Sequence, residues 1–312
     1  MRELAAIAAL TIAVALLPAF VTSGFVLNLA IMVLYSTLLG QAWNVLAGFG
    51  GQYSFGHALF FGTGAYTSAA LQVHLGVNAW LALPLAIASG AAAGALVGAL
   101  SFRYGLRGSY FALVTLAFAE VFRILANSVQ FTGGGVGLLL PLKESAANMQ
   151  FAGKPGFLYL ILTLTLAGIL ASWWLKQSRF GAWLAAVRDS EESAAALGVD
   201  VFRVKLAAIM LSAALMAAGG VFYVQYFHYV DPHIAYGPAV SVEALLGPIV
   251  GGLGTVFGPL LGAVVLQLLG EITRNLAGDV PGVSLVVYGV ALVGMVMFLP
   301  RGVAGLIARR GA

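Results

Sequence analysis

Residues 4–35 read LAAIAALTIAVALLPAFVTSGFVLNLAIMVLY, and this stretch decides the class of fold. It begins a run that lies between Glu3 and Arg103 and contains no Asp, Glu, Lys or Arg. A membrane-spanning helix needs about 20 predominantly apolar residues, so the run is long enough for four such helices. A water-soluble fold carries charged residues on its surface far more often than this. The stretch therefore predicts a chain that crosses a lipid bilayer several times.

The composition of the whole chain agrees with that prediction. Of its 312 residues, 61% are hydrophobic and 8% are charged, against about 25% charged in soluble proteins. The mean hydropathy is +1.00. These values exclude a soluble enzyme, a disordered tail and a module that binds nucleic acid. Cysteine is absent, which excludes disulfides, thiolate catalysis and cysteine metal sites.

Apolar runs predict about ten membrane-spanning helices, within a range of eight to ten. The expected spans are residues 5–22, 26–47, 54–73, 79–101, 109–130, 157–175, 206–227, 241–257, 258–275 and 284–299. The first run is compatible with a signal peptide, but a retained first span is favoured in a polytopic protein. The predicted fold class is an all-α integral membrane protein, with residues 1–312 as a single transmembrane domain.

The eighth and ninth expected spans meet in a stretch that is poor in helix-forming residues. Gly251-Gly252-Leu253-Gly254 lies at their junction, between Pro248 and Pro259. Either two short helices or a broken hairpin that re-enters the membrane fits this pattern.

Basic residues indicate the orientation, because Lys and Arg gather in cytoplasmic loops. With a cytoplasmic N-terminus and ten spans, both termini lie inside. Eleven of the 15 basic residues then fall on the inner side: Arg2, Arg103, Arg107, Lys176, Arg179, Arg188, Arg203, Lys205, Arg301, Arg309 and Arg310. The outer loops keep Lys143 and Lys154.

One cytoplasmic loop, residues 176–205, is longer and more charged than the others. Asp189 or Ser190 can cap a short helix there, with Glu191 and Glu192 in its first turn and Gly198 as its stop. A solvated connector and a helix that docks into a groove of another protein both fit this pattern.

Several motifs, taken in order, resemble one family. Residues 52–66 read QYSFGHALFFGTGAY, residues 107–120 read RGSYFALVTLAFAE, and Thr132-Gly133-Gly134 follows. Further matches are Lys205, Ser212, Gly219-Gly220, Gly251 to Gly254, and Gly258-Pro259. Together they resemble the LivM type of branched-chain amino acid permeases, which are membrane subunits of ABC importers. The resemblance covers residues from about 40 to 300 and is less specific for the substrate, because urea and short-amide permeases look similar.

The resemblance implies a function and a set of partners. The chain is then a permease subunit in the bacterial inner membrane that carries Leu, Ile and Val, without a cofactor. Its partners are a second homologous permease, two ATP-binding subunits and a periplasmic or extracellular substrate-binding protein. Loop 176–205 resembles the coupling loop of such permeases, and the residues implied in coupling are Arg188, Asp189, Glu191, Glu192, Ala194, Ala195 and Gly198.

The chain itself lacks the phosphate-binding motif of ATPases, since the one Gly-Lys pair is Gly153-Lys154, followed by Pro155. It is therefore not expected to be an enzyme, and ATP hydrolysis would belong to separate subunits. A stand-alone channel or ion-coupled carrier is the alternative from another class. Carriers of that kind usually have several intramembrane carboxylates, and the sequence places only Glu120 in the middle of a span.

Candidate residues of a substrate pathway follow from polar positions within apolar runs. They are Gln52, Ser54, His57, Thr115, Glu120, Thr132, Gly133 and Gly134. Residues 50–57 form either a surface loop or a break that lines a pore. Glu120 pairs with Arg123 on one helix face, and a structural pair is favoured over contact with a substrate's ammonium group.

Two outer stretches carry their own alternatives. Gly133 and Gly134 offer backbone N–H groups to a carboxylate, or they form an ordinary turn. His228, Asp231 and His233 lie close together in an outer loop, but no fourth ligand is evident, and no metal site is expected. We expect that loop to help dock the external binding protein.

Overall fold

A computed structural model describes residues 2–277, 286, 289–290, 293–294, 297 and 302–305. The chain is almost entirely helical, as expected. Its longer helices are α1 (Arg2–Phe20), α2 (Gly24–Asn44), α3 (His57–Leu75), α4 (Ala79–Arg103), α5 (Gly108–Ser128), α6 (Lys154–Gln177), α7 (Arg179–Asp189), α9 (Val201–Phe227), α11 (Pro238–Gly251) and α12 (Gly258–Ala277). The shorter elements are α8 (Glu191–Ala196), α10 (Pro232–Ala235), β1 (Leu138–Leu139) and β2 (Tyr229–Val230).

Seven helical segments of the described residues are long and apolar enough to cross a membrane. They are Glu3–Phe20, Gly24–Phe49, Ala79–Arg103, Gly108–Ser128, Lys154–Gln177, Val201–Phe227 and Pro232–Gly251. The chain is thus a multi-pass membrane protein. Helices α3 and α12 correspond to two further expected spans but are not among the seven. The last expected span, 284–299, lies largely outside the described residues.

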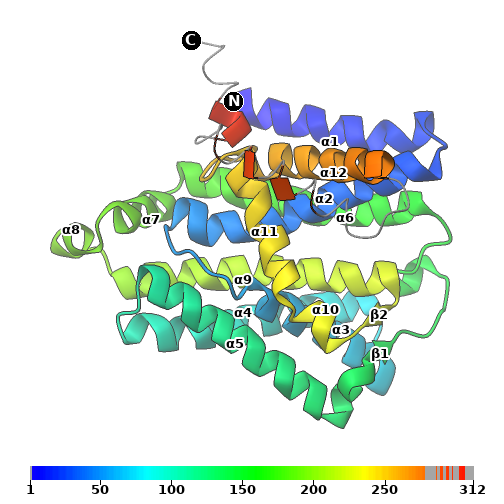
Figure 1. Ribbon diagram of the computed structural model, residues 1–312, viewed down its shortest axis with the longest axis horizontal. Coiled ribbons are helices and arrows are strands. Elements are labelled where there is room, and N and C mark those ends of the chain that lie inside the picture. The colour runs from blue at the N-terminus through cyan, green and yellow to red at the C-terminus, as the bar shows by residue number, and fades with distance from the viewer. Residues whose placement is uncertain are drawn as a thin grey trace.

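Helix α9 is the centre of the bundle. It packs against α3 and α4 on one side and against α2 and α6 on the other (Figure 1). Helices α4 and α9 approach closely because small residues face each other: a Cβ added at Gly90 would lie 2.3 Å from the Cβ of Ala217. This contact gives a reason for the abundance of glycine in the chain, since dispersion between close backbones holds membrane helices together.

The chain between α2 and α3 does not form a simple surface loop. Helix α2 continues into a π-helical turn, Val45–Phe49, and residues 50–56 then run back into the bundle without helical structure. Helix α3 begins only at His57, whose Nε2 lies 2.9 Å from Oγ of Ser212, near the midpoint of α9. The expected span 54–73 therefore starts three residues later than predicted and inside the protein.

The glycine-rich junction near residue 250 joins two helices that pack on each other. Helix α11 ends at Gly251, six residues earlier than the expected span 241–257, and α12 begins at Gly258. A Cβ at Gly262 would lie 1.8 Å from the carbonyl oxygen of Gly247, so the two backbones touch there. Helix α11 alone is about 21 Å long at 1.5 Å per residue, which is shorter than the apolar core of a bilayer.

The two ends of the bundle differ. Helices α7 and α8 project from the left end in Figure 1, between the ends of α6 and α9. The opposite end carries the small β1–β2 ribbon, in which Leu138 pairs with Val230. The predicted inner loop and the predicted outer loops thus lie at opposite ends of the molecule.

Candidate functional site

Ser54, His57 and Thr115 come together inside the bundle. All three side chains are buried. Thr115 Oγ1 accepts the backbone N–H of Phe55 at 3.2 Å, and Ser54 Oγ accepts that of Gly56 at 3.2 Å. The backbones of α5 and the 50–56 segment touch here, because a Cβ at Gly56 would lie 2.0 Å from the Thr115 carbonyl oxygen. The polar side chains of the break are thus covered by protein, whereas Tyr53 and Phe55 within it are exposed.

The N-terminus of α3 is fixed by hydroxyl groups from two other helices. His57 contacts Ser212 of α9, and Ser212 Oγ donates to the carbonyl oxygen of Ala42 in α2 at 2.6 Å. Ser241 Oγ of α11 accepts the backbone N–H of Ala58 at 2.9 Å. His57 is therefore a buried, hydrogen-bonded side chain that ties α3 to α9.

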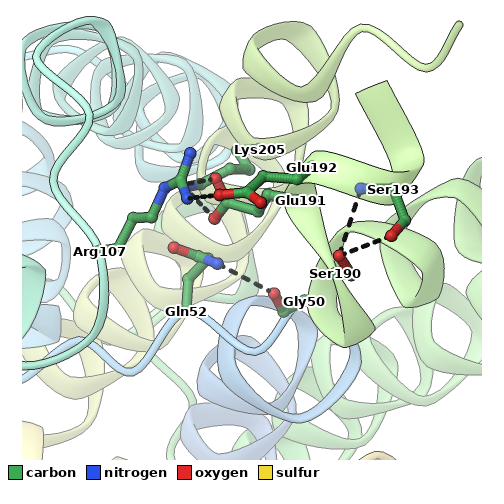
Figure 2. A network of polar contacts seen from close by, with 8 residues as sticks. All are labelled: Gly50, Gln52, Arg107, Ser190, Glu191, Glu192, Ser193 and Lys205. Atoms are coloured by element: carbon green, nitrogen blue, oxygen red, sulfur yellow. Dashed lines mark hydrogen bonds and ion pairs between the residues drawn. The ribbon is translucent and has the colours of Figure 1, made fainter. Parts of the chain in front are cut away.

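Gln52 lies apart from that cluster, at the end of the bundle where α8 projects. Its amide nitrogen donates to the carbonyl oxygen of Gly50 at 3.3 Å (Figure 2). Its Oε1 atom is buried and has no hydrogen-bond partner within the described part of the chain. The structure thus separates Gln52 from Ser54 and His57, although the sequence placed all three in one polar break.

Glu120 and Arg123 form a bidentate pair on α5. The Arg123 Nε–Glu120 Oε2 distance is 2.8 Å and the Nη2–Oε1 distance is 2.5 Å. Arg123 Nη1 also donates to Nδ1 of His233 in α10, at 3.1 Å. The pair therefore ties α5 to α10, while the Glu120 side chain remains 48% exposed in the isolated chain.

A cavity of about 320 Å³ opens next to this pair. Glu120, Leu116 and Ala119 of α5 line one side, and Phe55, Tyr236, Pro238 and Ser241 line the others. A second cavity of about 290 Å³ lies further toward the β1–β2 end, and Tyr236 and Thr132 are among its lining residues. Tyr236 belongs to both cavities, so the two are neighbours along one face of the bundle.

Gly133 and Gly134 use their backbone N–H groups within their own turn. Gly133 donates to the carbonyl oxygen of Gln130 at 3.0 Å, and Gly134 donates to that of Val129 at 3.1 Å. The hydroxyl of Thr132 also donates to a backbone oxygen, that of Ala126, at 2.6 Å. This geometry matches the ordinary-turn alternative, although Thr132 does line the second cavity.

The charged loop forms the helix that the sequence predicts. Ser190, and not Asp189, is its cap: the Ser190 hydroxyl accepts the backbone N–H of Ser193 at 3.2 Å. Helix α8 ends before Gly198, whose φ of 87° is a conformation that glycine adopts without strain. Ala194 is buried, whereas Ala195 is exposed. Leu197 is 85% exposed and forms an apolar tip.

The two glutamates of α8 differ in their surroundings. The Glu191 side chain is 14% exposed and lies between Lys205 Nζ, at 2.8 Å, and Arg107 Nε, at 3.0 Å (Figure 2). The Glu192 side chain is 89% exposed and only approaches Arg107, at 3.9 Å. The sequence does not reveal this difference, because it gives both residues the same place in the first turn.

Arg188 connects the loop to the bundle. Its Nη1 atom donates to the carbonyl oxygen of Gly48 in the π-helical turn at 3.3 Å, and its Nε atom contacts the exposed Asp189 at 3.1 Å. A Cβ at Gly51 would lie 2.5 Å from Cγ of Arg188, so glycine there leaves room for this arginine. Loop 176–205 thus contacts the start of the 50–56 segment.

Sequence reasoning misses Glu243, which is a second carboxylate within a membrane-spanning segment. Its Oε1 atom accepts the hydroxyl of Ser36 in α2 at 2.7 Å, and Gln267 of α12 donates to the same hydroxyl oxygen at 2.9 Å. The prediction that only Glu120 lies in the middle of a span is therefore wrong, since Glu243 lies near the middle of the segment Pro232–Gly251. The position of Glu243 inside the expected span 241–257 was the signal that identifies it.

Asp231 and His233 have partners other than a metal, whereas Nε2 of His228 is buried without a hydrogen-bond partner among the described residues. Asp231 Oδ1 accepts the backbone N–H groups of His233 and Ile234, which caps α10, and His233 contacts Arg123. Burial lowers the pKa of His228, and nearby Glu144 only partly opposes this. Across the residues that the structure describes, no three His, Cys, Asp or Glu side chains are grouped to hold a metal ion.

With this geometry in view, comparison with known proteins identifies the family. A family model for the permease component of branched-chain amino acid transport systems matches residues 25–297. The chain belongs to this family. The resemblance predicted from residues 52–66 and 107–120 is thereby confirmed, and the permease is a transport subunit rather than an enzyme.

Three relatives show the range of similarity. The permease is 32% identical to the high-affinity branched-chain amino acid permease protein LivM of Salmonella typhimurium, over 96% of the permease and 74% of that protein. It is 23% identical to LivH of the same organism, over 73% of the permease and 78% of LivH. The autoinducer 2 import permease LsrC of Klebsiella pneumoniae is 33% identical over 39% of the permease and 36% of LsrC.

Proposed function

We propose that the permease is a membrane subunit of an ATP-driven ABC importer for branched-chain amino acids in the bacterial inner membrane. Residues 1–312 act as one transmembrane domain, with both termini cytoplasmic and loop 176–205 as its coupling loop. Its partners are a second homologous permease, two ATP-binding subunits and a periplasmic or extracellular substrate-binding protein. The similarity to both LivM and LivH supports a pair of related permeases.

The projecting helix α8 is the observation that carries the proposal. The exposed Glu192 and Leu197 of this short capped helix do not pack on the bundle, whereas its Glu191 and Ala194 do. It offers one apolar tip, Leu197, and one charge, Glu192, to a groove of another protein. Apolar anchors surrounded by polar residues are typical of protein interfaces. Ala195 and the rest of the exposed face complete the contact.

We place the substrate pathway along the cavity beside α5. Among the seven apolar segments, α5 is 28% buried and only the segment Glu3–Phe20 is less covered, which suits a helix that faces a second permease. Leu116, Ala119 and Phe55 give the cavity the apolar wall that a branched aliphatic side chain requires. The Ser241 hydroxyl accepts from Ala58 and keeps its own proton for a substrate carboxylate. Glu120, held by Arg123, is part of the wall.

Purification tests the proposal directly. The tagged permease is extracted from its own bacterial membrane in mild detergent, and the co-purifying proteins are identified. We expect a second permease and ATP-binding subunits. In proteoliposomes containing ATP, with the binding protein added outside, we expect uptake of labelled leucine, isoleucine and valine in preference to urea or acetamide. A permease that purifies alone and transports alone would contradict the importer.

A matched pair of variants tests the docking surface. Leu197→Asp places a charge on the apolar tip of α8, and we expect the ATP-binding subunits to be lost during purification. Leu142→Asp is the control, because Leu142 is 71% exposed and lies in the loop after β1, at the end of the bundle opposite to α8. Equal retention of the ATP-binding subunits in both variants would show that α8 is not the contact.

A further inference from the structure

One carboxylate holds α8 to the permease. Both oxygens of Glu191 are used: Oε2 contacts Arg107 and Oε1 contacts Lys205 (Figure 2). Lys205 is nearly inaccessible, with 3% of its side chain exposed. Because little solvent reaches the Glu191–Lys205 contact, the attraction between the two charges is screened far less than at an exposed surface.

Arg107 and Lys205 both connect Glu191 to α5, Arg107 directly and Lys205 through two aromatic rings. Arg107 is the residue directly before α5. The Lys205 ammonium group lies 4.5 Å from the ring centroid of Phe102, which makes a cation–π contact. Phe102 in the last turn of α4 stacks on Phe111 of α5, with ring centroids 5.1 Å apart and planes 25° apart. Phe111 is fully buried, so this second connection ends inside the bundle.

These connections do not follow from the order of the chain. In the chain, α8 directly follows α7 and is joined to α9 by residues 197–200. Helix α5 lies much earlier, and the loop with β1, α6 and α7 separates it from α8. Movement of α8 therefore reaches α6 and α9 through the backbone. It reaches α5 through Glu191, and α5 carries Leu116, Ala119 and Glu120 of the cavity wall.

We propose that Glu191 is the positioning residue that passes the movement of α8 to α5, with Arg107 and Lys205 as its two contacts. This rests on the proposed function, in which α8 meets the ATP-binding subunits. Glu192 and Leu197 meet the partner, while Glu191 faces inward and sets where α5 lies. Loss of Glu191 then leaves the ATP-binding subunits bound and active but separates ATP hydrolysis from movement of the substrate.

The experiment uses the assembled importer with Glu191→Gln, Arg107→Gln and the double variant. The measured quantities are retention of ATP-binding subunits, the rate of ATP hydrolysis, and leucine taken up per ATP hydrolysed. We expect retention and hydrolysis to persist in all three variants. We expect uptake per ATP to fall by roughly tenfold, a magnitude typical of energetic coupling between sites. The double variant should be no worse than either single one, because both remove the same contact.

The chain offers a matched control pair on the same loop. Asp200 and Arg203 form an exposed ion pair at 3.0 Å, with side chains 53% and 85% exposed. Asp200→Asn keeps a cap for α9 and removes the same charge as Glu191→Gln, and Arg203→Gln removes the same charge as Arg107→Gln. We expect uptake per ATP to be unchanged in both controls.

The possible failures are distinguishable. Unchanged uptake per ATP in Glu191→Gln, or additive losses in the double variant, would overturn the role of Glu191 while leaving the importer intact. Loss of ATP-binding subunits from Glu191→Gln would also overturn it, by showing that Glu191 faces the partner. A wild-type permease that assembles with no ATP-binding subunit would instead overturn the proposed function.

Discussion

Glu120 and Arg123 neutralise each other on α5, and each would be costly alone. An ionised side chain within a membrane-spanning segment needs a partner or water, and the carboxylate here accepts two N–H groups from one guanidinium group. The contact of Arg123 with His233 adds a link to α10. The structure thus gives the pair a packing role in addition to a place on the cavity wall.

Removal of one charge should therefore destabilise the permease. We expect Glu120→Gln to lower the melting temperature in detergent, since it leaves Arg123 without its carboxylate. Arg123→Met in the same chain should restore both stability and leucine uptake. Thermal unfolding and uptake are measured on the same preparations.

The double variant separates two roles for Glu120. If the carboxylate binds the substrate's ammonium group, the Glu120→Gln, Arg123→Met permease should be stable yet inactive. That result would show that Glu120 recognises the substrate rather than stabilising the packing of α5.

Residue types could be predicted from the sequence, but their partners could not. The first-turn position of Glu191 and Glu192 followed from the local pattern of cap and acidic residues. The contacts of Glu191 with Arg107 and Lys205 join segments that are distant in sequence, and no local pattern reports such distances. The contact of Glu243 with Ser36 could not be predicted for the same reason, although the position of Glu243 within an expected span is visible in the sequence.

Helix α3 shows what hydropathy can predict and what it cannot. Apolar content located the helix to within a few residues. The depth of its start was not predictable, because the polar residues 50–56 fit a surface loop as well as a buried segment. Contacts of His57 with Ser212 and of Phe55 with Thr115 fix where α3 begins, and these contacts form only when the bundle packs.

Helices α4 and α9 are in such close contact that a larger side chain between them should destabilise the permease. Gly90→Val should destabilise the permease by about 2 kcal/mol, because its added atoms overlap Ala217 and packed helices tolerate overpacking poorly. Gly270→Val is the control, since an added Cβ there meets no atom of the described residues within 4 Å. We expect the control to change stability by less than about 0.5 kcal/mol.

Thermal unfolding in detergent provides the comparison. Equal melting temperatures for the Gly90 and Gly270 variants would show that α4 and α9 are not packed as closely as described.

In the whole molecule, the two ends of the bundle differ both in shape and in the number of basic residues. Helix α8 and the Glu191 contacts lie at one end, and the β1–β2 ribbon lies at the other (Figure 1). Eleven basic residues were assigned to the inner side from the sequence, and five of them lie in loop 176–205, which contains α7 and α8. The excess of Lys and Arg predicts that the α8 end is cytoplasmic.

Labelling of single cysteines tests this orientation, because the chain contains no native cysteine. Ser145 and Ser193 are both exposed and lie in loops at opposite ends. We expect Ser145→Cys to react with an impermeant maleimide added to intact cells, and Ser193→Cys to react only after the membrane is opened. The reverse pattern would invert the orientation.

The start of α3 inside the bundle has an electrostatic consequence. A helix N-terminus carries about half a positive elementary charge from its aligned peptide groups. Here that end, at Gly56, His57 and Ala58, lies level with the midpoint of α9 and beside the cavity lined by Phe55 and Ser241. The helix end thus contributes positive potential there without the desolvation of an ionised side chain. If the cavity is the substrate route, we expect this end to repel sodium ions and hydrated protons, so that an amino acid passes without dissipating the ion gradients of the cell.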